Sequence, residues 1–220
     1  MGFNWIEFDV QLTNDNFAII IHDDTLSRTT NTKDCDDLLV YNTVNIIEKL
    51  NVENTDYKVP LLSDIKKLYT TSASTGRVVL NIELKVPYNL KPTTSRYKQY
   101  VNDLVITTKN EISNWPNNFI PLISSFDWNI LLKTDDIFNH NIYLGFLSEY
   151  ELNKEQLTLI NNVKNKNKTR VLSISLDKQV ILQKNNIALY KHYVDIILIY
   201  TVNDYCEYKY LIENGVDGPL

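Results

Sequence analysis

The sequence predicts an α/β fold built on a parallel β-sheet. Short apolar runs alternate along the chain with stretches of helical periodicity, and strands joined through helices pair in parallel. Leaving out one early hairpin, we expect six parallel strands. Such strands could form an open doubly wound sheet or most of an eight-stranded barrel. Polar residues at the ends of several strands favour the barrel, and no glycine-rich phosphate loop supports a nucleotide-binding fold.

The first predicted strand spans residues 5–12 and carries two acids on one face. Its side chains alternate between faces, so the residues that share the polar face are Trp5, Glu7, Asp9 and Gln11. The opposite face is apolar and expected to be buried. Glu7 and Asp9 would lie about 6 to 7 Å apart along the strand, and a divalent cation with oxygen ligands would relieve their repulsion. The alternative is a half-exposed strand whose acids are solvated.

The second apolar run, residues 17–21, follows a connector too short for a parallel crossover, so we expect it to form a hairpin with the first strand. It leads directly into His22, Asp23 and Asp24. Histidine is well suited to proton transfer near neutral pH, which makes His22 a catalytic candidate. The alternative is an ordinary loop histidine. Arg28 is expected to order this loop by pairing with Asp23 or Asp24.

Later elements follow from periodicity and capping signals. Strands are expected over residues 77–86, 121–126, 142–147, 171–176 and 196–202, and helices over residues 44–50, 60–69, 97–112, 128–138, 155–163 and 203–214. Asp177 and Asn203 are the expected N-caps of the helices that follow them, and Gly215 is the expected stop of the last helix. The basic run of Lys164, Lys166, Lys168 and Arg170 predicts a solvated connection between a helix and a strand.

Composition limits the functional classes. The chain has 220 residues, 44% of them hydrophobic and 22% charged, and a net charge of -5 argues against nonspecific nucleic-acid binding. No run approaches the length of a membrane span, and the N-terminus has no signal-peptide character. Cys35 and Cys206 do not indicate a disulfide framework or a zinc site. We therefore expect a cytoplasmic protein with a single domain over residues 1–220.

Several segments together resemble the glycerophosphodiester phosphodiesterase family, in particular its cytoplasmic bacterial branch. The specific ones are WIEFDVQLT, IIIHDDTLSRTTN and LNIELK. The segments VPLLSDI, PLISSFDWNIL, VLSISL, ILIYTVND and IENGVDG occur in the order and roughly the spacing that this family uses. The resemblance covers essentially the whole chain.

The resemblance implies a TIM barrel with a small insertion after the strand that carries Glu7 and Asp9. It implies that Glu7, Asp9 and Glu83 hold Mg²⁺ or Ca²⁺, that His22 is one of two catalytic histidines, and that Lys85 faces the phosphate. The implied reaction is metal-dependent hydrolysis of a small glycerophosphodiester to glycerol 3-phosphate and an alcohol. Phe126 and Tyr200 are candidates for lining the substrate pocket, with packing inside the barrel as the alternative.

The chain also departs from the family pattern. The family begins with a strand carrying His-Arg-Gly, which would precede Met1, and continues past Gly-Val-Asp-Gly into a last strand. We therefore expect an incomplete barrel that lacks the first strand and most of the last, truncated at both ends. His140 and His192 match no family position. The alternative function is a catalytically impaired remnant, truncated or from a split gene, that retains the metal cluster.

Overall fold

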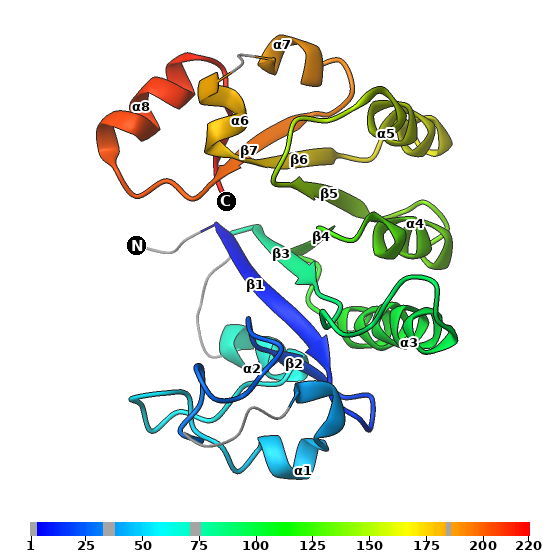
Figure 1. The fold of residues 1–220 in the computed structure, drawn as a ribbon, viewed down its shortest axis with the longest axis vertical. Helices are drawn as coiled ribbons and strands as arrows, with labels where there is room; N and C mark the ends of the chain where they lie inside the picture. Colours follow the sequence, from blue (N-terminus) through cyan, green and yellow to red (C-terminus); the bar gives the residue numbers. More distant parts are fainter. Residues whose placement is uncertain (1–3, 33–37, 71–75, 184–185) are drawn as a thin grey trace. The chain divides into compact units, whose positions relative to one another are not determined.

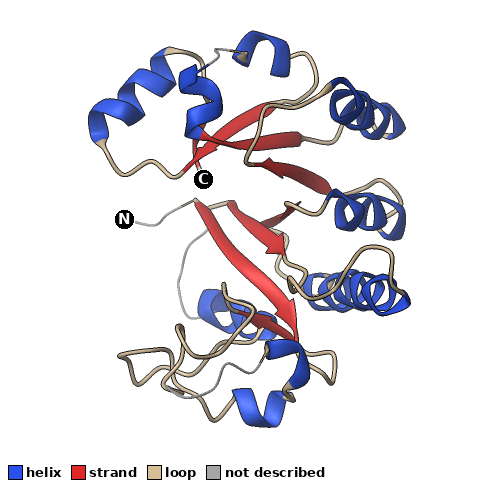
Figure 2. Cartoon of the chain, viewed as in Figure 1, coloured by secondary structure: helices blue, strands red, loops and turns tan. Residues whose placement is uncertain are grey.

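A computed structural model describes residues 4–32, 38–70, 76–183 and 186–220 of the chain. The chain divides into two compact units, Met1–Pro121 and Leu122–Leu220. In both units strands alternate along the chain with helices, which confirms the predicted α/β class (Figure 1, Figure 2). Among the described helices, none is both long and apolar enough to cross a membrane.

The strands of the first unit are β1 (Trp5–Leu12), β2 (Ala18–Ile20) and β3 (Val78–Leu84). β1 pairs with β2 in antiparallel orientation and with β3 in parallel orientation, so β1 lies between them (Figure 1). The apolar face of β1 is buried at Phe8, Val10 and Leu12, but Ile6 is 37% exposed. The expectation of a fully buried face is therefore wrong at Ile6, near the start of the strand.

Between β2 and β3 the first unit holds short helices around a small core of its own. They are η1 (Leu39–Tyr41), α1 (Val44–Ile47), η2 (Leu62–Asp64) and α2 (Ile65–Thr70). The core consists of Ile19, Ile21, Leu26, Leu39, Ile47 and Val59. Because Ile21 and Leu26 belong to this core, the segment between them is anchored at both sides. That segment contains His22.

Helix α3 (Ser95–Ile112) follows β3. Thr94 caps it by accepting a hydrogen bond from the backbone N–H of Tyr97. The buried residues recur at helical spacing, as the sequence predicts, and they include Tyr100, Val101 and Leu104. Tyr100 ties the helix to the strands, because its hydroxyl accepts from the Leu12 N–H at 3.0 Å and donates to the carbonyl of Lys85 at 3.3 Å.

The second unit holds five parallel strands in the order β4-β5-β6-β7-β8, the first of which starts in the last residues of the first unit. The strands are β4 (Phe119–Ser125), β5 (Tyr143–Ser148), β6 (Leu172–Asp177), β7 (Ile196–Tyr200) and β8 (Gly218–Pro219). The helices are α4 (Trp128–Ile137), α5 (Lys154–Lys166), α6 (Lys178–Gln183), α7 (Ile187–Tyr190) and α8 (Tyr205–Glu213).

The start of helix α8 differs from the prediction. Its N-cap is Asp204, whose carboxylate accepts from the backbone N–H of Glu207 at 2.8 Å, and not Asn203. Strand β7 likewise ends at Tyr200, two residues earlier than predicted. The predicted stop is confirmed, because Gly215 adopts a φ of 98°, which glycine tolerates at a helix end.

Candidate active site

The candidate site is built on the polar faces of β1 and β3. The parallel register places Asp9 beside Glu83 and Glu7 beside Asn81. Residues that are register partners on neighbouring strands project to the same side of a sheet, and so do residues two apart on one strand. The four side chains therefore form a two-by-two array, as the alternation along each strand predicts.

Three carboxyl groups of this array lie close together. Glu7, Asp9 and Glu83 each offer an oxygen, and these oxygens lie within 4.8 Å of one another. Burial and the neighbouring charge of Asp9 raise the pKa of Glu83 to about 8. Burial and the same charge of Asp9 raise the pKa of Glu7 to about 7, although Lys85 and His22 oppose the shift. Without a bound cation, these two glutamates therefore retain protons near neutral pH.

Lys85 follows the last residue of β3 and is directed toward the acids. Its Nζ lies 3.4 Å from Asp9 Oδ1, and its side chain is 21% exposed. The backbone of Lys85 is held at both polar atoms: its N–H donates to the carbonyl of Val10 at 3.1 Å, and its carbonyl accepts from Tyr100. The lysine thus supplies one positive charge against three carboxyl groups.

The array fits a hard divalent cation. Such ions prefer carboxylate and amide oxygens, and three carboxylates with one lysine leave excess negative charge. Asn81 is 1% exposed, and its Oδ1 is buried with no hydrogen-bond partner in the described part of the chain. Buried polar atoms nearly always have a partner, so an unpaired oxygen beside the acids is consistent with an ion or an ordered water there.

His22 lies just after β2 and takes part in a chain of polar contacts. Its Nδ1 is 2.7 Å from Asp23 Oδ1, and both Asp23 oxygens accept hydrogen bonds from the Arg28 guanidinium. These hydrogen bonds from Arg28 lower the pKa of Asp23 to about 2, so Asp23 is ionised and Nδ1 of His22 is the donor. Nε2 is then left to accept or donate a proton. The predicted pairing of Arg28 with this loop is confirmed, and its partner is Asp23.

Phe126 and Tyr200 lie in the second unit, at the C-terminal ends of β4 and β7. Their rings form an edge-to-face pair with centroids 5.7 Å apart. Phe126 is 45% exposed, so one face of this pair is open to solvent. Their role in lining a substrate pocket stays a prediction.

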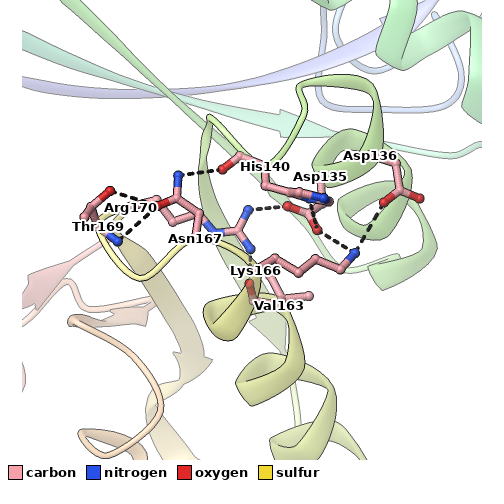
Figure 3. Close-up of polar contacts among 8 residues, drawn as sticks. All are labelled: Asp135, Asp136, His140, Val163, Lys166, Asn167, Thr169 and Arg170. Atoms are coloured by element: carbon pink, nitrogen blue, oxygen red, sulfur yellow. Dashed lines mark hydrogen bonds and ion pairs between the residues drawn. The ribbon is translucent and has the colours of Figure 1, made fainter.

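A second acidic cluster, Asp135, Asp136 and His140, lies in the second unit and is already paired with cations. Arg170 hydrogen-bonds to Asp135, and Lys166 contacts Asp135 at 3.0 Å and Asp136 at 3.3 Å (Figure 3). Although burial raises the pKa of Asp135, the hydrogen bonds from Arg170, Lys166 and His140 hold it below its usual range. We interpret this cluster as a structural ion network. The prediction that the basic run ending at Arg170 is exposed to solvent is wrong for Arg170 itself, which is only 4% exposed.

Some residues of the site were not singled out from the sequence. Gln11 was placed on the acid face, but its contacts with the His22 segment depend on how that segment folds back onto β1. Tyr100 lies within the helix predicted over residues 97–112, and that prediction does not reveal that its hydroxyl joins the ends of β1 and β3.

Comparisons with known proteins identify the family of this chain. The sequence model of the "Glycerophosphoryl diester phosphodiesterase family" matches residues 1–219. A glycerophosphodiester phosphodiesterase of Bacillus altitudinis is 26% identical over 229 residues, which cover 99% of this chain and 82% of that protein.

Solved structures show the same fold. A phosphodiesterase of Oleispira antarctica, in complex with the product sn-glycerol-3-phosphate, aligns with a TM-score of 0.79 at 20% identity, covering 100% of this chain and 81% of that one. A glycerophosphodiester phosphodiesterase of Parabacteroides distasonis aligns with a TM-score of 0.70 at 17% identity, covering 97% of this chain and 77% of that one. Since the family model spans nearly every residue, the chain belongs to the glycerophosphoryl diester phosphodiesterase family.

Proposed function

We propose that this chain hydrolyses glycerophosphodiesters to glycerol 3-phosphate and an alcohol, with Mg²⁺ or Ca²⁺ bound by Glu7, Asp9 and Glu83. The observation that carries the proposal is the convergence of these three carboxyl groups, with oxygens within 4.8 Å of one another, in a chain of this family. The product bound to the Oleispira antarctica phosphodiesterase supports the substrate class.

Each residue has a role that follows from the chemistry of a phosphodiester. Its anionic oxygens repel nucleophiles, and a bound divalent cation supplies positive charge that offsets this repulsion. Lys85 adds a further positive charge and orients the phosphate. His22 either removes a proton from the attacking hydroxyl or donates one to the leaving alcohol at Nε2, while Asp23 holds the opposite nitrogen of the ring.

Further parts of the proposal come from the sequence. Phe126 and Tyr200 would contact the substrate through their ring faces and edges. The cytoplasmic location stays a prediction.

The test is release of glycerol 3-phosphate from glycerophosphocholine, with Mg²⁺ or Ca²⁺ added. We expect release that EDTA abolishes and that falls about 100- to 10,000-fold in His22→Ala, the range expected for loss of a general acid or base. The matched control is His192→Ala, because His192 is exposed in the second unit, and this variant should keep full activity.

Two results would contradict the proposal. One is full activity in Glu83→Gln after EDTA treatment, which would exclude a role for the acid cluster. The other is no release at all by folded protein that binds the cation. That second result would favour the alternative raised by the sequence, a catalytically impaired relative that retains the cluster.

A further inference from the structure

Gln11 is the last polar residue on the acid-bearing face of β1, and its side chain is completely buried. Its amide nitrogen lies 3.0 Å from the carbonyl oxygen of Asp23, 3.2 Å from that of His22 and 3.4 Å from that of Ile21. One side chain of β1 therefore contacts three consecutive backbone carbonyls, and the middle one belongs to His22.

This convergence needs a donor at its centre. Consecutive carbonyls of an extended chain point in alternating directions, so three of them meet at one point only where the backbone curls. A primary amide nitrogen carries two hydrogens, which it can share among these acceptors. Without that donor, these buried or partly buried carbonyls would lose their hydrogen bonds to the side chain.

The same segment is attached to β1 at a second point. The backbone N–H of Ile21 donates to the carbonyl of Asp9 at 3.1 Å, two residues before Gln11. The His22 ring is oriented separately, through Asp23 and Arg28. The backbone position of His22 and the orientation of its ring are thus set by different residues. Among the described residues, no hydrogen bond joins Gln11 to the imidazole.

We infer that Gln11 is a positioning residue: it fixes the backbone of His22 relative to the carboxyl groups on its own strand. The consequence for catalysis rests on the proposed function of His22. Asp9 and Gln11 lie on the same face of β1, so this strand carries a cation ligand and also holds the backbone of the proton-transfer group. A displacement of about 1 Å in such a group can lower a rate about 100-fold.

The variant Gln11→Met keeps the length of the side chain and removes both donors. We expect kcat for glycerophosphocholine to fall about 10- to 100-fold, while KM and the affinity for Mg²⁺ change less than about twofold. The matched control is Gln183→Met, the same change at an exposed helical position, and it should leave kcat unaltered.

A second readout does not depend on activity. The chain has 3 histidines, so the imidazole signals of His22, His140 and His192 can be followed individually by NMR. We expect the His22 signals to shift or broaden in Gln11→Met and those of His140 and His192 to stay in place. Should Gln11→Met not fold, Gln11→Asn keeps the amide but shortens its reach, and we expect the same change at His22 with a smaller loss of kcat.

A double-variant comparison separates positioning from a general loss of structure. If Gln11 acts through His22, adding Gln11→Met to His22→Ala lowers kcat no further. An equal loss in both backgrounds, or unchanged His22 signals in Gln11→Met, would overturn the inference. Full activity of His22→Ala would contradict the proposed function instead, and the NMR comparison would still decide whether Gln11 fixes the backbone.

Discussion

At the scale of single residues, Glu7 and Glu83 are carboxyl groups whose protons the fold retains to a higher pH than usual. Their pKa values of about 7 and about 8 lie well above the ordinary value of 4.5, because burial and the charge of Asp9 both disfavour ionisation. An unfolded chain would release these protons near pH 4.5. Folding of the cation-free protein is therefore linked to proton uptake between these pH values.

The sign of this linkage gives a prediction. Between about pH 5 and pH 8 the folded state binds more protons than the unfolded state, so the free energy of unfolding falls as pH rises, by at most about 1.4 kcal/mol per pH unit for each proton. Urea unfolding in EDTA at a series of pH values would measure it. Glu83→Gln should flatten the fall, and a rise in stability across this window would contradict the prediction.

Strand alternation alone placed Glu7 and Asp9 on one face, whereas the family resemblance added Glu83 to the predicted ligands. The sequence did not reveal the hydrogen bonds made by Gln11, because they depend on the conformation of a segment ten residues away. Arg170 was assigned to solvent because neighbouring lysines made the run look uniformly exposed. Only the tertiary ion pair between Arg170 and Asp135 of α4 shows that one of these cations is buried.

At the scale of elements, the ion network of Asp135 joins the end of α4, the end of α5 and Arg170, two residues before β6 (Figure 3). The Asp135 side chain is fully buried and that of Arg170 is 2% exposed. Arg170 also donates a hydrogen bond to the carbonyl of Val163 in α5. Because both charged partners are buried, each depends on the other to offset the loss of hydration.

Asp135→Asn should therefore destabilise the protein by about 3 to 5 kcal/mol, the range for leaving a buried charge without its partner. The matched control is Lys209→Ala, which removes an exposed pair with Glu213 at 3.8 Å and should cost less than about 1 kcal/mol. Urea or thermal unfolding would measure both. A loss for Asp135→Asn as small as that of the control would show that the network contributes little.

The order and type of the elements were predictable because each strand and helix has its own hydrophobic period. The residues at which these elements begin and end were less predictable. Asn203 and Asp204 are adjacent and both are favoured N-caps, so composition could not choose between them. The choice depends on the backbone, which leaves Asp204 extended and directs its carboxylate to the N–H of Glu207.

At the scale of the whole molecule, the acid cluster, Lys85 and His22 all belong to the first of the two compact units. The α/β class could be predicted from alternating periodicities. Periodicity alone left an open sheet equally possible, polar residues at the strand ends favoured a barrel, and the family resemblance implies one. The antiparallel pairing of β1 with β2 was predictable from the short connector, but the other strand neighbours in each unit had to come from the structure.

The division of the chain into two units predicts which strands a bound cation stabilises. Adding Mg²⁺ should slow hydrogen exchange most at the amides of β1 and β3, because ligands from both strands become linked. The strands β5 and β6 in the second unit should change least. Hydrogen-exchange mass spectrometry with and without Mg²⁺ would show the pattern, and Glu83→Gln should abolish it. Protection largest in β5 and β6 would contradict the assignment.

The alignment of Asp9 with Glu83 has a consequence for how the chain folds. If β1 slipped past β3 by one residue, its acids would turn toward the apolar side and its aliphatic side chains would replace them. In a misaligned molecule the carboxyl groups of β1 would no longer lie beside Glu83. A divalent cation bound as proposed would therefore stabilise only correctly paired molecules, so adding Mg²⁺ during refolding should raise the yield of native protein.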